Sequence, residues 1–237
     1  MHNTITIIGS VHEATKNYTA DDLYQKLCEI KPDIILFEFP MEWEKDLQAR
    51  INYGVKTKNV ESIAFEKFAA THDVIVKPYD IEGRNSYYMK TKYFEKEEQL
   101  SKAYDTYFKS SNPNPAAVAY KKLLRKNGRI QREWDKKSLS EINSPACDIV
   151  TEAYINISHT AFLAVLELVP ELTPYKAGHQ RMQNYEVKRN KAMVKNILDY
   201  NRQYDNKSIV VLCGYYHRYA LIKLLQGKQA KEGFVLR

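Results

Sequence analysis

Two short apolar runs, one near each end of the chain, are followed by glycine and histidine at the same spacing. The run at 4–8 leads into Gly9-Ser-Val-His12, and the run at 208–213 leads into Gly214-Tyr-Tyr-His217. Short runs rich in β-branched residues predict β-strands, and a following glycine predicts a sharp turn or a close backbone approach. Both histidines are thus expected just beyond strand ends, where an imidazole can bind a metal ion or transfer a proton.

Strand-like and helix-like segments alternate along the chain. The residues from Thr4 to Phe37 predict one βαβ unit, whose helix opens at Thr19-Ala-Asp-Asp. Further strands are predicted at 74–76, 208–213 and 234–236, and further helices at 60–70, 146–169, 185–203 and 220–225. This alternation predicts an α/β fold in which helices flank a mainly parallel central sheet.

The middle of the chain has a different character. Residues 85–145 are charged, rich in tyrosine and helical in pattern, and their apolar face is too thin to suggest a core of their own. We therefore predict a single α/β domain over 1–237, with a helical insertion or lid at 85–145.

Polar residues gather where the predicted strands end. Glu38 directly follows the second strand, and Asp80, Glu82 and Arg84 follow the third. Ligands of open α/β sheets bind beyond the carboxyl ends of the strands, so these side chains predict a site, with Glu38 near His12 if the first two strands are neighbours. Each residue alone has a simpler explanation, because a loop histidine, a paired Glu38 or a helix-capping Asp80 needs no ligand.

Net charge and cysteine content indicate the expected partners and cellular compartment of the protein. The net charge is +7, but the basic residues between Lys56 and Lys137 are interleaved with acidic ones, which indicates solvated helix faces and does not favour nucleic acid as a partner. Three widely spaced cysteines, in apolar stretches, indicate buried free thiols in a reducing compartment. The apolar stretch from Thr160 to Val169 is too short to span a bilayer, so we expect no membrane partner and a cytoplasmic location.

Several common catalytic motifs are missing from the sequence. It contains no Gly-x-x-x-x-Gly-Lys loop, no Gly-x-Gly-x-x-Gly, no Gly-x-Ser-x-Gly nucleophile elbow and no His-Glu-x-x-His. Cys213 lies inside a strand and is interpreted as a core residue. The sequence therefore offers no obvious nucleophile, and the histidines and Glu38 remain the main candidates.

The motif residues resemble the TraB/TIKI family, which includes TraB/PrgY and GumN-like proteins, within the wider erythromycin-esterase and ChaN-like fold group. The family pattern begins with a Gly-x-x-His after the first strand, here Gly9 to His12, and a Glu that ends the second strand, here Glu38. A late helix carries Arg-Asn, here Arg189-Asn190 with Met193 nearby, and a second Gly-x-x-His follows, here Gly214 to His217. The layout fits from Thr4 to about Leu225, but residues 85–180 carry no matching motif. Ser10 stands where threonine is commoner, and Arg218 and Tyr219 follow His217 in place of small residues.

This resemblance implies a metal-dependent, protease-like hydrolase that acts on a peptide or small-molecule substrate. His12, Glu38 and His217 would bind a divalent ion, manganese or cobalt rather than zinc, or act as acid and base. Arg189 would pair with Glu38 or stabilise an oxyanion. The resemblance also implies that Asn190 supports the site by hydrogen bonds. From their places in the two motif segments and after the third strand, we expect five more residues to support the site or face the substrate: Ser10, Asp80, Glu82, Arg84 and Tyr216.

Two alternatives stay open at this point. One is a metal-free, esterase-like hydrolase that uses Glu38 and a histidine to activate water. The other is a protein without catalysis that binds a small ligand, haem or an anionic partner. The sequence gives no indication of the oligomeric state.

Overall fold

The computed structural model describes residues 2–46, 59–110 and 112–237. They form two compact units. The α/β unit comprises Met1–Glu82, Glu133–Ile149 and Arg189–Arg237, and the helical unit comprises Gly83–Arg132 and Val150–Lys188. Each unit is described by itself.

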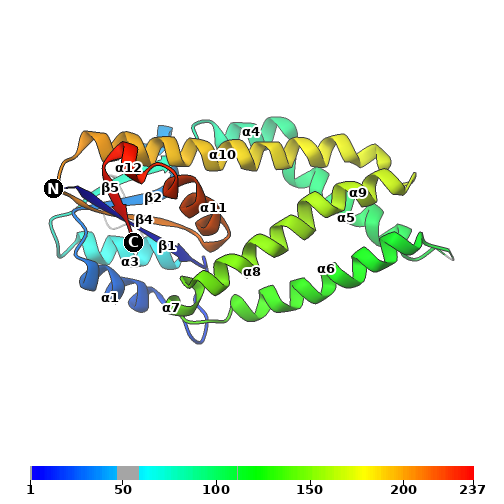
Figure 1. The fold of residues 1–237 in the computed structure, drawn as a ribbon, viewed down its shortest axis with the longest axis horizontal. Helices are drawn as coiled ribbons and strands as arrows, with labels where there is room; N and C mark the ends of the chain where they lie inside the picture. The colour runs from blue at the N-terminus through cyan, green and yellow to red at the C-terminus, as the bar shows by residue number, and fades with distance from the viewer. Residues whose placement is uncertain (1, 47–58, 111) are drawn as a thin grey trace. The chain divides into compact units, whose positions relative to one another are not determined.

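A five-stranded sheet forms the centre of the α/β unit (Figure 1). Its strands are β1 (Asn3–Ser10), β2 (Ile34–Pro40), β3 (Ile75–Asp80), β4 (Ser208–Gly214) and β5 (Phe234–Leu236). All pairings are parallel, and the strand order is β3-β2-β4-β1-β5. The predicted α/β fold with a parallel central sheet is confirmed, and the strand predicted at 234–236 is the edge strand β5.

The strand order corrects one expectation. β1 and β2 are not neighbours, because β4 lies between them and pairs with both. A strand from late in the chain, β4, thus completes the sheet between the first two strands. The βαβ unit predicted for the first forty residues could not reveal this separation, because the strand between β1 and β2 comes from a distant part of the sequence.

Helices cover both faces of the sheet. On one face lie α1 (Ala20–Ile30) and α3 (Val60–Ala69), packed on residues such as Ile35 and Leu212. On the other lie α11 (Tyr215–Gln226) and the later part of α10 (Lys176–Gln203), packed on Leu36 and Val211. Successive strand residues point to opposite faces, so the continuous apolar runs of the sequence fill both layers.

The short elements of this unit are η1 (Met41–Trp43), α7 (Leu139–Ile142) and α12 (Gln229–Glu232). Thr19 caps α1, as its sequence predicted: the Thr19 side chain accepts from Asp22 N while the Asp22 carboxylate accepts from Thr19 N. This reciprocal pair satisfies backbone donors that the first turn of a helix leaves without partners.

The helical unit is larger than the insertion predicted at 85–145. It contains α4 (Arg84–Thr91), α5 (Tyr93–Tyr107), η3 (Thr173–Tyr175), α9 (Phe162–Leu168), a π-helical segment (Asn156–Ala161) and the first part of α10. Most of α6 (Pro115–Trp134) and of α8 (Pro145–Ile155) also belongs to it.

The helical unit also has a hydrophobic core, contrary to the expectation that its apolar face is too thin. Leu100, Tyr107 and Tyr120 pack with Val165 and Leu166, among others. The last two lie beyond the predicted insertion. The apolar partners of the tyrosine-rich helices therefore come from a later segment, which a reading of 85–145 alone leaves out.

The apolar helical stretch around Thr160 to Val169 is longer than the sequence analysis counted. The helical stretch Pro145–Leu168 is long and apolar enough to cross a membrane, judged by length and composition only. Most residues of its most apolar 18-residue segment are not buried. The sequence-based estimate counted only Thr160 to Val169 and therefore judged the stretch too short. Core helices of water-soluble proteins can pass the same test, and the cytoplasmic location stays a prediction.

Candidate functional site

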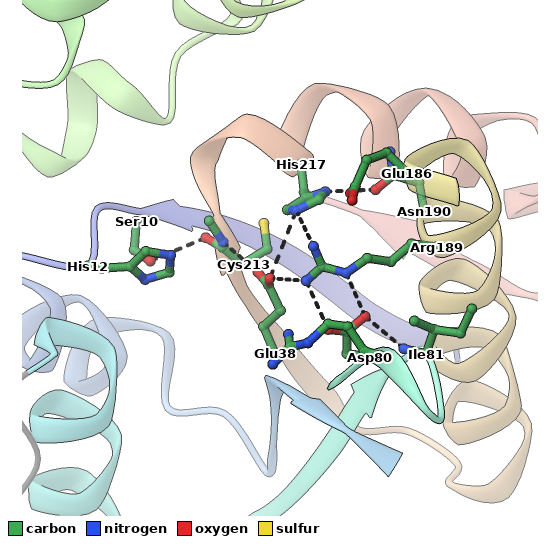
Figure 2. A network of polar contacts seen from close by, with 12 residues as sticks. Ser10, His12, Glu38, Asp80, Ile81, Glu186, Arg189, Asn190, Cys213 and His217 are labelled. Atoms are coloured by element: carbon green, nitrogen blue, oxygen red, sulfur yellow. Dashed lines mark hydrogen bonds and ion pairs between the residues drawn. The ribbon is translucent and has the colours of Figure 1, made fainter. Parts of the chain in front are cut away.

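The candidate site lies in the α/β unit, at the carboxyl ends of β1, β2, β3 and β4 (Figure 2). It has two parts, which come from opposite layers. Glu38 and Asp80 meet Arg189 of α10 and His217 of α11, and Ser10 and His12 meet α3. The sheet ends thus bring together side chains that the sequence separates by up to two hundred residues.

Arg189 is the centre of the first part. Its Nε and Nη2 donate to the two carboxylate oxygens of Asp80 at 2.9 and 2.8 Å, a bidentate pair. Nη2 also donates to Glu38 Oε1. Asp80 is fully buried and Arg189 nearly so. Buried carboxylates of this kind need a charged partner, and the planar fork of arginine satisfies two of them at once.

His217 completes this part with a defined tautomer. Arg189 Nη1 lies 3.1 Å from His217 Nε2, and Asn190 Oδ1 lies 2.7 Å from His217 Nδ1. Because an arginine N–H can only donate, Nε2 accepts and Nδ1 carries the proton that goes to Asn190. Asn190 therefore holds the His217 ring by a hydrogen bond.

Glu38 is held as a carboxylate. Burial opposes its ionisation, but the charge of His217 when its ring is protonated, the charge of Arg189 and the Gly214 N–H, 2.8 Å from Oε2, lower the pKa of Glu38 to about 2. The register of β2 against β3 shifts between Phe37 and Pro40, and Glu38 lies in this irregular stretch. Such irregularities redirect a side chain next to a site.

His12 and a carboxylate of α3 form the second part of the site. His12 Nδ1 lies 2.9 Å from Glu61 Oε1, and the Ser10 hydroxyl donates to the same oxygen at 2.5 Å. The Glu61 side chain is only 3% exposed, whereas that of His12 is 68% exposed. The hydrogen bond to Glu61 raises the pKa of His12, although burial of part of the ring opposes the shift.

Glu61 is the important residue that the sequence analysis missed. It lies in the first turn of α3, where Asn59 accepts from Ser62 N as the helix cap, so a glutamate there has the ordinary explanation of a dipole partner. Its position next to Val60 and three residues before Ala64, which are both buried, was the available indication that Glu61 faces the interior. Among the described residues, Glu61 Oε2 has no hydrogen-bond partner.

Gly9 is needed for close packing, whereas a Cβ at Gly214 would make only ordinary van der Waals contacts. A Cβ on Gly9 would lie 2.8 Å from Tyr215 Cβ and 2.9 Å from Tyr215 Cα, so glycine lets α11 approach β1. A Cβ on Gly214 would lie 3.7 Å from Glu38 Oε2 and 3.8 Å from His12 Nε2. Gly9 is inside β1 and α11 begins at Tyr215, which corrects the expected loops: His217 is in the first turn of a helix.

The position of Gly214 also links the two parts of the site. His12 Nε2 and Glu38 Oε2 both lie within 4 Å of the same point above Gly214. No hydrogen bond joins His12 Nε2 to any residue that the structure describes. This nitrogen thus faces the space beside Glu38 and the amino end of α11, where the helix dipole favours negative charge.

Three further predicted residues, Glu82, Arg84 and Tyr216, have surroundings of their own. Glu82 is exposed, and Arg84 belongs to the helical unit, where its Nε donates to Asn85 Oδ1. Tyr216 is 37% exposed and packs its ring on Tyr215. Cys213 is buried, and burial raises the pKa of its thiol well above the ordinary value, as a core residue requires.

The donor set does not fit a metal ion held by His12, Glu38 and His217. Arg189 donates to both Glu38 and His217 Nε2, so a cation bound to these atoms would have to displace a buried guanidinium. Among the described residues, no group of three histidine, cysteine or acidic side chains is placed to hold a metal. The divalent ion implied by the resemblance stays a prediction.

Searches against protein-family models, curated proteins and solved structures found no match for this chain. The resemblance to the TraB/TIKI family therefore stays a prediction based on the motif residues. The function has to be argued from the geometry of the site.

Proposed function

We propose that the protein is a hydrolase that cleaves a carboxylic ester or peptide bond by acid/base catalysis at His12. The observation that carries this proposal is the 2.9 Å contact between His12 Nδ1 and the buried Glu61 carboxylate. A carboxylate bonded to one imidazole nitrogen fixes the tautomer and leaves the other nitrogen basic, which is the arrangement that general-base histidines need.

In this proposal, His12 Nε2 takes a proton from a water molecule that attacks the substrate carbonyl. The negative charges of Glu61 and Glu38 both stabilise the imidazolium that forms, since each raises the pKa of His12. His12 then returns the proton to the leaving group. The amino end of α11 favours the oxyanion that develops beside Gly214, and Arg189 offsets the charge of the nearby Glu38 and Asp80 carboxylates.

The network around Arg189 positions these groups. Arg189 holds Glu38 and Asp80 in place and bonds to His217, so His217 supports the site and does not itself transfer the proton. The family resemblance instead implies a metal-dependent hydrolase with both histidines as ligands. Acid/base catalysis at His12 and metal-dependent hydrolysis predict different effects on turnover when metal is removed or His217 is replaced.

The test is turnover of an ester and a peptide panel by purified wild type, His12→Ala and His217→Ala, each with EDTA and with added manganese, cobalt or zinc. Acid/base catalysis contributes about a hundredfold or more, so His12→Ala should lose that factor with its melting temperature unchanged. His72→Ala, an exposed histidine of the same unit, is the matched control.

EDTA should leave the turnover of the wild type unchanged. Full turnover by His12→Ala would show that the proposal is wrong. Turnover that depends on added metal, with stoichiometric metal lost in the His12→Ala/His217→Ala double variant, would instead favour the metal-dependent hydrolase.

A further inference from the structure

The helical unit contains a cavity that is lined only by its own residues and is separate from the proposed hydrolase site. It has a volume of about 340 Å³ and is lined by residues of α4, α5 and α10. Small-molecule pockets begin at about 300 Å³, so the cavity matches a ligand of a few tens of atoms. Its lining combines aromatic rings with basic side chains: Tyr87, Tyr93, Tyr185, Lys96, Arg181 and Lys188.

The three basic residues of this lining, Lys96, Arg181 and Lys188, form no ion pairs within the described part of the chain. Other lysines of the helical unit do form them: Lys92 pairs with Glu95, Lys102 with Glu98 and Lys176 with Glu167. Two carboxylates, Glu97 and Glu186, lie near Tyr93 of the lining, so the three cations outnumber the acidic groups beside the cavity and favour an anion.

Tyrosine rings supply a flat apolar wall beside these cations. Tyr87 and Tyr185 are stacked, with 3.6 Å between ring centroids and 5° between planes. Tyr88 and Tyr93 continue the cluster, and their hydroxyls lie 3.5 and 3.4 Å from Glu186 Oε1. Glu186 thus accepts from both tyrosine hydroxyls. Stacked rings of this kind bind planar aromatic groups.

We propose that this cavity binds a small anion that carries a planar heteroaromatic ring, of the mononucleotide class. The phosphate would lie among Lys96, Arg181 and Lys188, and the ring would lie against the tyrosine wall. Cations alone would take any phosphate, and tyrosines alone any aromatic ring. Their convergence on one cavity of this size selects a ligand that has both parts, and its limited volume favours a single nucleotide over a nucleic-acid strand.

The experiment is isothermal titration calorimetry of the full chain with AMP, and with adenosine and inorganic phosphate as the two halves of the probe. AMP should bind more tightly than either half, and its affinity should fall as salt rises, because the cations are exposed. Arg181→Ala should weaken AMP binding about tenfold, the loss expected for one charge-assisted contact. Tyr87→Leu should weaken the binding of both AMP and adenosine.

The matched control is Arg129→Ala, an exposed arginine of the same unit that does not line the cavity, and it should bind AMP as the wild type does. His12→Ala should also keep AMP binding, so failure of the hydrolase proposal and failure of this one are distinguishable. The proposal is overturned if AMP does not bind at about millimolar concentration, or if Arg181→Ala and Tyr87→Leu bind it unchanged. Tighter binding of a single-stranded oligonucleotide than of AMP would also overturn it.

Discussion

Glu61 holds His12 through a single contact between a buried carboxylate and an exposed imidazole, 2.9 Å long. The backbone supports the same pairing, since Val60 N donates to the carbonyl oxygen of His12 at 3.1 Å. The first turn of α3 therefore fixes both the chain at His12 and the direction of its ring. An exposed histidine with one buried anchor can meet a substrate without losing its orientation.

Glu61→Gln should lower the pKa of His12, because the hydrogen bond to Glu61 is the main reason that this pKa is raised. Only neutral His12 can act as a base, so activity should rise with pH through the pKa of His12. In the variant this rise should move to lower pH, and the maximal rate should fall about tenfold or more. NMR titration of the histidine ring signals, with His12→Ala for assignment, measures the pKa directly.

Glu66→Gln, on the same helix, is the control for the change of charge and should leave both the His12 pKa and the rate profile unchanged. If Glu61→Gln keeps the pKa and the rate of the wild type, Glu61 does not position His12.

Arg189→Met should destabilise the α/β unit strongly. It would leave the fully buried Asp80 and the mostly buried Glu38 without their cation, a loss of about 3–5 kcal/mol for a buried pair. Arg189→Lys should recover only part of this, since a lysine cannot form the bidentate pair with Asp80. Urea unfolding measures the free energy, and the exposed Arg129→Ala is the control. A change below about 1 kcal/mol in Arg189→Met would contradict the central role of this ion pair.

Stability should fall in acid because of Glu38. Its pKa is about 2 in the folded chain against an ordinary value of 4.5, so its contribution is complete above pH 4.5 and is lost as pH falls toward 2. The shift corresponds to about 3 kcal/mol. Glu38→Gln should be less stable at neutral pH and lose less stability between pH 4.5 and 2. The exposed Glu13→Gln should follow the wild type, as urea midpoints at a series of pH values would show.

Gly9→Ala should destabilise the protein by about 1–3 kcal/mol, because the new Cβ would meet Cα and Cβ of Tyr215, which cannot move without α11. The shift of α11 should also reduce turnover, since α11 carries His217. Gly178→Ala in α10 is the matched control: no atom lies within 4 Å of its Cβ position, and alanine there should stabilise the helix by up to about 1 kcal/mol. Thermal unfolding of both variants decides whether close packing requires Gly9.

Periodicity predicted the elements well where neighbouring residues decide them. The helix expected at 60–70 is α3, and the apolar run at 208–213 is β4. The helical unit was less predictable, because Tyr120 packs against Phe162, from a segment that the sequence analysis placed outside the insertion. Local patterns show which residues are buried, but not which distant residues bury them.

The sequence by itself determined the α/β class, the two Gly-x-x-His segments and the set of polar residues at strand ends, because these depend on side-chain periodicity and short-range backbone preference. Only the tertiary structure decided that β4 separates β1 from β2, that Gly9 makes room for Tyr215, and that Glu61 is the partner of His12. Each of these depends on contacts between residues that lie far apart along the chain. Such contacts follow from how whole layers pack, so no local pattern in the sequence encodes them.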